Sequence, residues 1–300
     1  MQITAPVDRR VGLSAAAVLA AALIWSSSFA VTKVVLAEVP PLTVGALRFG
    51  FAAAILGVLV RVRRDRRTLT RRQRIRIGGA GVLGITVYFA VENVGVDLAT
   101  ASDATLIVAA YPIITMVPEI LCGRARFSAI RFAGTLVAIG GVWLVVRGAA
   151  GAGGGHHLLG DAILLAGGIV WALYNFVAKR DDSGASAIVV TYYQTLAGAC
   201  GFALLAMSEA DSWSVPSGAN LARIAFLAAL CSVAAFLLYN HGLRGLDPSA
   251  AVNLLNIVPV AGLAWAVLLA GERLNPAQVL GGAIVIVGVM MGLHRNAVDH

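Results

Sequence analysis

Residues 12–37 read GLSAAAVLAAALIWSSSFAVTKVVLA, and this stretch decides the class of the protein. Lys33 is its only charged side chain. A helix of about 20 apolar residues spans the roughly 30 Å hydrocarbon core of a bilayer. The stretch is too long for the apolar region of an ordinary secretion signal, so it predicts a first transmembrane helix that is retained.

Similar apolar stretches fill the rest of the chain. Of its 300 residues, 59% are hydrophobic and 13% are charged, whereas soluble domains are about 45–50% apolar and about 25% charged. The sequence therefore predicts an all-α polytopic membrane protein with ten transmembrane helices and no soluble domain. The expected helices cover residues 12–37, 41–61, 75–93, 98–119, 127–146, 158–179, 185–207, 219–243, 248–269 and 275–293.

The basic residues indicate how these helices are oriented. Nine of the 23 lie between Arg61 and Arg76, in the connection between the second and third helices. With the N-terminus in the cytoplasm, the inside segments hold 17 basic residues and the outside loops hold only Arg147 and Arg273. This bias follows the positive-inside rule and predicts cytoplasmic termini in a bacterial inner membrane. A basic loop beside anionic lipid accounts for the net charge of +8, so no nucleic-acid partner is expected.

The two halves of the chain resemble each other. Trp25 and Lys33 recur as Trp171 and Lys179 at an offset of 146 residues. Five further matches share an offset of 147, which indicates a duplication. They pair Asn93 with Asn240, Gly95 with Gly242, Pro112 with Pro259, Gly134 with Gly281, and Gly141 with Gly288.

Each half holds five of the expected helices. Because five is odd, the second half must enter the membrane from the opposite side. The prediction is therefore two inverted five-helix repeats around a central cavity, a common plan of transporters. The repeats cover residues 1–147 and 158–300, and a glycine-rich external linker covers 148–157.

Four short segments carry a resemblance to a known family. Residues 25–33 read WSSSFAVTK, 47–49 read LRF, 171–174 read WALY and 270–274 read AGERL. They resemble the EamA-type drug/metabolite transporters over essentially the whole chain. Overall, the sequence is most similar to an exporter of aromatic amino acids within that superfamily. The resemblance implies ten helices, inverted repeats and transport. The sequence departs from the family pattern at Ser26, usually glycine, and at Ala125, where the first half lacks the glutamate of the GERL turn.

The candidate substrate cavity consists of aromatic and polar side chains, most of them near the middle of the helices. Polar groups are costly in lipid, so they should face a cavity or another helix. Trp and Tyr suit an aromatic or apolar solute, and the amides suit a carboxylate or an amine. Packing between helices is the alternative role. The candidates are Trp25, Ser28, Tyr88, Trp171, Tyr174, Asn175, Asn253 and Asn256.

Prolines and charges inside the helices are further candidates. Pro112 and Pro259 each free the carbonyl four residues earlier, which produces either a gating kink or a static bend. Lys33 and Arg48 lie toward the outer ends of their helices, so they are expected to snorkel, to form a structural pair with an acid such as Glu38, or to take part in coupling. No carboxylate is expected at a clear mid-helix position, which argues against an acidic proton relay.

The predicted function is a secondary transporter that exports small organic metabolites by alternating access. The favoured substrates are amino acids with aromatic or large apolar side chains, and a polyspecific drug or metabolite exporter is the alternative. A channel and a membrane-embedded enzyme are less favoured, because the sequence has no HExxH motif and no paired mid-helix acids. His156 and His157 supply too few ligands for a metal site, and no cofactor is expected. The expected partners are the substrate and membrane lipids, with the chain as a monomer or a dimer.

Overall fold

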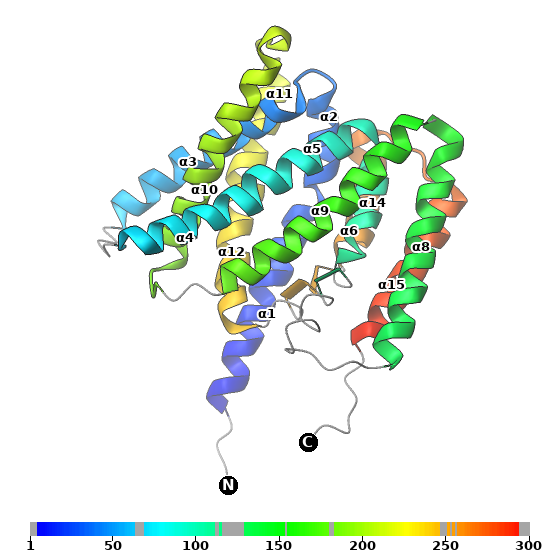
Figure 1. Cartoon of the computed structure of the whole chain (residues 1–300), viewed down its shortest axis with the longest axis horizontal. Helices are drawn as coiled ribbons and strands as arrows, with labels where there is room; N and C mark the ends of the chain where they lie inside the picture. The colour runs from blue at the N-terminus through cyan, green and yellow to red at the C-terminus, as the bar shows by residue number, and fades with distance from the viewer. Residues whose placement is uncertain are drawn as a thin grey trace.

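The computed structural model of the chain is a bundle of helices (Figure 1). It describes residues 5–63, 69–111, 114–115, 129–153, 155–179, 183–246, 251–252, 254–255 and 257–293. Every regular element in these ranges is helical. Six helical stretches within them are long and apolar enough to cross a membrane, so the chain is an integral membrane protein. These stretches are Val11–Leu36, Pro41–Val62, Arg71–Leu98, His156–Lys179, Ala187–Ser212 and Gly218–Gly245.

The helices follow the same order in both halves. The first half contains α1 (Ala5–Ser26), α2 (Ser28–Leu36), α3 (Pro41–Val62), α4 (Arg71–Gly81), η1 (Val82–Val87), α5 (Tyr88–Leu98), α6 (Ala101–Val108) and α8 (Ala129–Gly153). The second half contains α9 (Gly155–Lys179), α10 (Ala187–Ala206), η2 (Met207–Ser212), α11 (Gly218–Phe226), η3 (Leu227–Ala234), α12 (Ala235–Gly245), α14 (Ile257–Ala270) and α15 (Pro276–Leu293).

The first transmembrane helix is interrupted at Ser27, where the sequence predicts a continuous helix over 12–37. Three consecutive serine hydroxyls donate to carbonyls three residues earlier, and such bonds compete with the regular helix pattern and bend it. The acceptors of Ser26, Ser27 and Ser28 are the carbonyls of Leu23, Ile24 and Trp25, at 2.7, 2.9 and 2.8 Å.

The glycine-rich stretch is more regular than predicted. The sequence predicts a linker over 148–157, but α8 continues to Gly153 and α9 begins at Gly155. Extending an existing helix costs far less than nucleating one, and alanines alternate with the glycines here. The cost of about 1 kcal/mol per glycine is therefore not enough to end α8 at residue 146.

Two spans contain π-helical segments that the sequence does not predict. η1 lies between α4 and α5, and η3 lies between α11 and α12. A shift of 147 residues carries residues 82–87 of η1 onto 229–234, which lie within η3. Such segments often occur at functional sites. Gly84 of η1 packs directly against the ring of Tyr174, where a β-carbon would clash.

Equivalent helices of the two halves pack against each other in opposite directions. α8 and α15 lie side by side (Figure 1). Gly141 lies against Gly281, and Gly288 lies against Gly134, so the residue numbers rise along one helix as they fall along the other. Small residues let helix backbones approach closely in membrane proteins. α3 and α10 form a second antiparallel pair, since Gly45 lies against Phe202 and Gly57 lies against Tyr192. This pair brings together the equivalent helices that follow the first span of each half.

Two lysines at equivalent positions make equivalent contacts. Lys33 donates to carbonyls at the end of α5, and Lys179 donates to carbonyls at the end of α12. A cation is favourable at a helix C-terminus because the last carbonyls lack partners there. Lys33 thus caps α5, and its ammonium group does not pair with Glu38 among the described contacts. The acceptors are Val96 and Ala99 for Lys33, at 2.8 and 2.7 Å, and Leu243 and Leu246 for Lys179, at 3.0 and 2.8 Å.

Candidate functional site

A small aromatic chamber lies where the two halves meet. Its volume is about 40 Å³, close to the roughly 30 Å³ that one water occupies in the liquid. The two tryptophans at equivalent positions meet edge to face, with the ring centroids of Trp25 and Trp171 5.8 Å apart. The lining residues are Trp25, Ser28, Phe29, Tyr88, Phe89, Glu92, Val108, Tyr111, Trp171, Leu255 and Val258.

The structure brings four of the predicted cavity residues together around this chamber, namely Trp25, Ser28, Tyr88 and Trp171. Tyr174 and Asn175 are fully buried and do not line it. The predictions for Asn253, Asn256 and Pro112 lie outside the described residues.

Pro259 is buried in α14, next to the chamber residue Val258. Because proline has no N–H to donate, the carbonyl of Leu255 lacks its usual helical donor. It accepts instead from the backbone N–H of Val258 at 2.8 Å. Pro259 thus lies in the first turn of α14, where a helix tolerates proline, and the predicted kink stays a prediction.

Glu92 is the functional candidate that the sequence reasoning missed. Its carboxylate lines the chamber, and only 4% of the residue is exposed. Glu92 was overlooked because the predicted third helix ends at residue 93, whereas the third span runs from Arg71 to Leu98 and holds Glu92 six residues before its end. A glutamate one turn after Tyr88 in an apolar run was the available signal, since acids inside membrane helices are functional candidates by default.

Arg48 lies near Glu92 and is fully buried, so the prediction of snorkelling was wrong. Its Nε donates to Ser232 Oγ at 2.7 Å, and the guanidinium lies 4.6 Å from the ring centroid of Phe89. Both terminal nitrogens lack a hydrogen-bond partner among the described residues. Arg48 is within electrostatic range of the Glu92 carboxylate. Its charge therefore offsets the acid beside the chamber.

Glu38 does not pair with Arg48. Its carboxylate accepts from the backbone and hydroxyl of Ser217 and from the amide of Asn220, at the start of α11. The hydrogen bonds from Ser217 lower the pKa of Glu38, which lies outside the membrane-spanning stretches. The predicted pairing was wrong because the nearest donors come from a helix remote in sequence.

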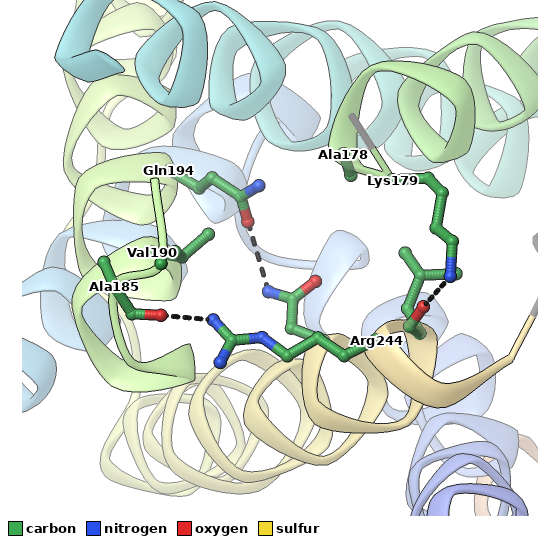
Figure 2. Close-up of a pocket in the computed structure, with 9 residues that line it drawn as sticks. Ala178, Lys179, Ala185, Val190, Gln194 and Arg244 are labelled. Atoms are coloured by element: carbon green, nitrogen blue, oxygen red, sulfur yellow. Dashed lines mark hydrogen bonds between the residues drawn. The ribbon is translucent and has the colours of Figure 1, made fainter. Parts of the chain in front are cut away.

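A larger vestibule of about 390 Å³ lies between α9, α10 and α12 (Figure 2). Basic side chains of two helices line it, and each is held by a carbonyl: Arg244 donates to Ala185 at 2.6 Å and Lys179 to Leu243 at 3.0 Å. The lining residues are Ala178, Lys179, Gly184, Ala185, Val190, Gln194, Asn240, Leu243 and Arg244.

A neutral polar network connects the vestibule to the chamber. Gln194 and Asn240 line the vestibule, and their side-chain oxygens accept from the hydroxyl of Tyr174 at 3.4 and 3.1 Å. The ring of Tyr174 lies 5.1 Å from that of Trp171, which lines the chamber.

The comparison with known families agrees with this membrane architecture. The sequence pattern of the EamA-like transporter family matches the chain twice, at residues 12–147 and 158–293. The chain belongs to the EamA-like transporter family. Both matches together cover most of the sequence, and each corresponds to one of its two similar halves.

Relatives of this EamA-like chain are transporters by name. The uncharacterized transporter YyaM of Bacillus subtilis is 25% identical over 88% of each chain. A probable terminal-alkyne amino-acid exporter of Streptantibioticus cattleyicolor is 25% identical over 89% of each chain. A solved crystal structure, 21% identical, covers 93% of this chain and 95% of its own with a TM-score of 0.69, which shows a shared fold. The chain is therefore a membrane transporter of the EamA type.

The chamber of this EamA-like transporter offers a solute two polar groups of opposite kind. The Glu92 carboxylate accepts hydrogen bonds, and the indole N–H of Trp171 has no acceptor among the described residues. The equivalent indole of Trp25 is already used, because it donates to the carbonyl of Cys231 at 2.8 Å. The site thus combines a carboxyl group with an unpaired indole N–H among aromatic rings.

Proposed function

We propose that this protein is a ten-helix secondary transporter that exports amino acids with aromatic or large apolar side chains. Two inverted repeats, residues 1–147 and 158–300, are joined by residues 148–157, and both termini are cytoplasmic in a bacterial inner membrane. Alternating access exposes the central chamber to each side in turn. The antiparallel packing of α8 with α15 and of α3 with α10 supports the inverted arrangement.

One observation carries the substrate class: Glu92 is the only charged residue among the described lining of a chamber that is otherwise aromatic and apolar, apart from Ser28. A carboxylate between aromatic faces suits an ammonium group, which gains both ion pairing and cation–π attraction. The free indole N–H of Trp171 suits the substrate carboxylate. The remaining aromatic wall then contacts the side chain of the amino acid.

The chamber of about 40 Å³ is far below the roughly 300–1,000 Å³ of pockets for drug-sized ligands, and it is also too small for an aromatic amino acid. It therefore has to widen before either kind of solute can enter. A polyspecific exporter of cationic drugs is the second candidate, because such solutes also present an ammonium group to Glu92. The name of the terminal-alkyne amino-acid exporter supports the first candidate.

Counterflow of labelled phenylalanine into proteoliposomes tests the proposal. Unlabelled phenylalanine and phenethylamine should compete, whereas phenylpropionate, which lacks the ammonium group, should compete weakly. Glu92→Gln should weaken the competition by phenylalanine and phenethylamine by about 10-fold or more, because it removes a charged hydrogen bond of about 1.5–3 kcal/mol. It should leave the competition by phenylpropionate unchanged.

Glu209→Gln is the matched control, because Glu209 binds the start of α3 and does not line the chamber. Equal competition by all three compounds, or unchanged competition in Glu92→Gln, would contradict the proposed recognition. Equally strong competition by unrelated organic cations would favour the polyspecific exporter. Flux that does not saturate would favour a channel.

A further inference from the structure

A second buried polar cluster lies apart from the chamber, where α6 and α9 begin. Asp103 belongs to the first turn of α6, and His157 and Asp161 belong to the first turns of α9. One potential ligand atom from each residue lies within 4.8 Å of the others. Asp103 and Asp161 are fully buried, and the side chain of His157 is 17% exposed. Asp103 comes from the first half of the chain and the other two come from the second half.

Asp103 is well supported by hydrogen bonds. Its Oδ1 accepts from Gln278 Nε2 at 2.8 Å, and its Oδ2 accepts from Thr100 Oγ1 at 2.7 Å. The same Oδ2 lies 3.6 Å from His157 Nδ1. These contacts fix the carboxylate so that it faces the histidine.

Asp161 lacks such support. Both of its carboxylate oxygens are buried, and neither has a hydrogen-bond donor in the part of the chain that the structure describes. His157 Nδ1 likewise lacks a hydrogen-bond partner there. A buried carboxylate without a partner costs several kcal/mol, so this arrangement calls for a cation between the three side chains.

The nearest other charges already have partners. Glu272 accepts from the backbone N–H groups of Ala101 and Ser102 at 2.7 and 2.9 Å, which caps the start of α6. The ammonium group of Lys33 is held by the carbonyls at the end of α5. Neither group supplies a counter-charge that touches Asp161 among the described contacts.

We propose that Asp103, His157 and Asp161 bind a divalent transition-metal ion of the Zn²⁺ type. Zn²⁺ accepts imidazole nitrogen together with carboxylate oxygen. Mg²⁺ and Ca²⁺ favour all-oxygen sites, so the histidine selects against them. Three protein ligands leave one coordination position for water. Gln278, in α15, donates a hydrogen bond to the Asp103 carboxylate and so orients it, as outer-shell partners of metal ligands do.

The ion ties the two halves together. It joins α6 of the first half to α9 of the second half at the ends where both helices begin. If the proposed alternating access separates these ends, the bound metal slows transport. Metal binding itself does not depend on the transported solute, so it can be measured without transport.

Titration of the purified full-length chain in detergent tests the site, with Zn²⁺ followed by calorimetry. The chain is first stripped with a chelator, and its cysteines are alkylated. We expect one Zn²⁺ per chain, with binding at least about 10-fold weaker in Asp161→Asn and in His157→Gln, because losing a ligand costs no less than losing an outer-shell partner. His156→Gln is the matched control, since the neighbouring His156 is exposed and outside the cluster.

An unchanged elution volume in size-exclusion chromatography and an unchanged tryptophan fluorescence spectrum show that each variant is folded. If Asp161→Asn unfolds the chain, the Zn²⁺ affinity of His157→Gln decides alone. The side chain of His157 is partly exposed, so its replacement should leave the fold intact. Binding lost equally in His156→Gln, binding unchanged in His157→Gln, or no saturable Zn²⁺ binding to the wild-type chain overturns the proposal. The last result would mean that a proton neutralises the cluster. Loss of Zn²⁺ binding with phenylalanine counterflow intact would leave the proposed transport function standing.

Discussion

The two halves of the protein share their packing but differ in the chemistry of equivalent positions. Arg48 in α3 corresponds to Gln194 in α10, 146 residues later, and Glu92 in α5 corresponds to Tyr239 in α12, 147 residues later. The first half thus places a buried cation and a carboxylate beside the chamber. The second half places neutral groups there, and these are hydrogen-bonded to one another. The two halves thus share a scaffold, and at these two positions only the first half carries charged side chains.

The second half shows how neutral groups satisfy buried positions. The hydroxyl of Tyr239 donates to Asn175 at 2.7 Å, and Asn175 donates to the carbonyl of Trp171 at 2.8 Å. Asn240 donates to Thr191 at 2.9 Å. Buried polar groups that are fully paired specify a single arrangement. We infer that these paired groups of the second half hold the frame, and that the charged contact to the solute comes from Glu92 of the first half.

The largest loss of stability is expected for Arg48→Gln, which gives the first half the glutamine that stands at the equivalent position 194 of the second half. Arg48→Gln leaves Glu92 buried without its compensating charge, and breaking a buried pair in this way costs about 3–5 kcal/mol. Thermal unfolding in detergent, followed by tryptophan fluorescence, should show a large fall in Tm. The double variant Arg48→Gln/Glu92→Gln should recover most of it. A double variant no more stable than the single one would show that the two charges are not coupled.

An intermediate loss of stability is expected at the contact between α8 and α15, the equivalent helices of the two halves. A β-carbon on Gly141 would lie 2.7 Å from the carbonyl oxygen of Gly281, whereas one on Gly140 meets no described atom within 4 Å. Gly141→Ala should therefore destabilise the α8–α15 contact by about 1–3 kcal/mol, as overpacking does. Gly140→Ala should be neutral or slightly stabilising, because alanine favours helix. Similar Tm values for the two variants would mean that α8 and α15 do not pack at this crossing.

The smallest effect should come from the neutral network. Tyr239→Phe removes one hydrogen bond, to Asn175, at a cost of about 1 kcal/mol. Tyr192→Phe is the control, because the ring of Tyr192 contacts Tyr193 and the residue is only half-buried. Thermal unfolding of both variants beside the wild type measures the difference. If the Tm of Tyr192→Phe falls as far as that of Tyr239→Phe, the hydrogen bonds of the network do not contribute the stability proposed for them.

Much of the fold follows from local patterns in the sequence. Apolar length gives the spans, and the fixed offset between Lys33 and Lys179 anticipates their equivalent capping contacts. Those features depend on one helix at a time or on a repeated spacing. The break at Ser27 is less accessible, because it depends on which acceptors the serine hydroxyls find.

The candidate site is harder to predict because its parts are remote in the sequence. Glu92 was missed through an error of only five residues in a helix end, because that error placed it at the edge of a span that in fact continues six residues beyond it. The burial of Arg48 depends on Ser232, far along the chain. The cluster of Asp103 with His157 and Asp161 exists only after α6 and α9 have packed. Contacts between side chains of helices that are remote in the sequence leave no periodic pattern in it.

Labelling of two equivalent positions tests most directly whether the halves are inserted in opposite directions. Arg72 at the start of α4 corresponds to Ala219 at the start of α11, 147 residues later, and both are exposed. Single cysteines at these positions are introduced after replacement of Cys122, Cys200 and Cys231, and a membrane-impermeant maleimide is applied to intact cells and to inverted vesicles. Arg72→Cys should react only from the cytoplasmic side and Ala219→Cys only from the outside. Reaction of both cysteines from the same side would contradict the inverted repeat and the central chamber built on it.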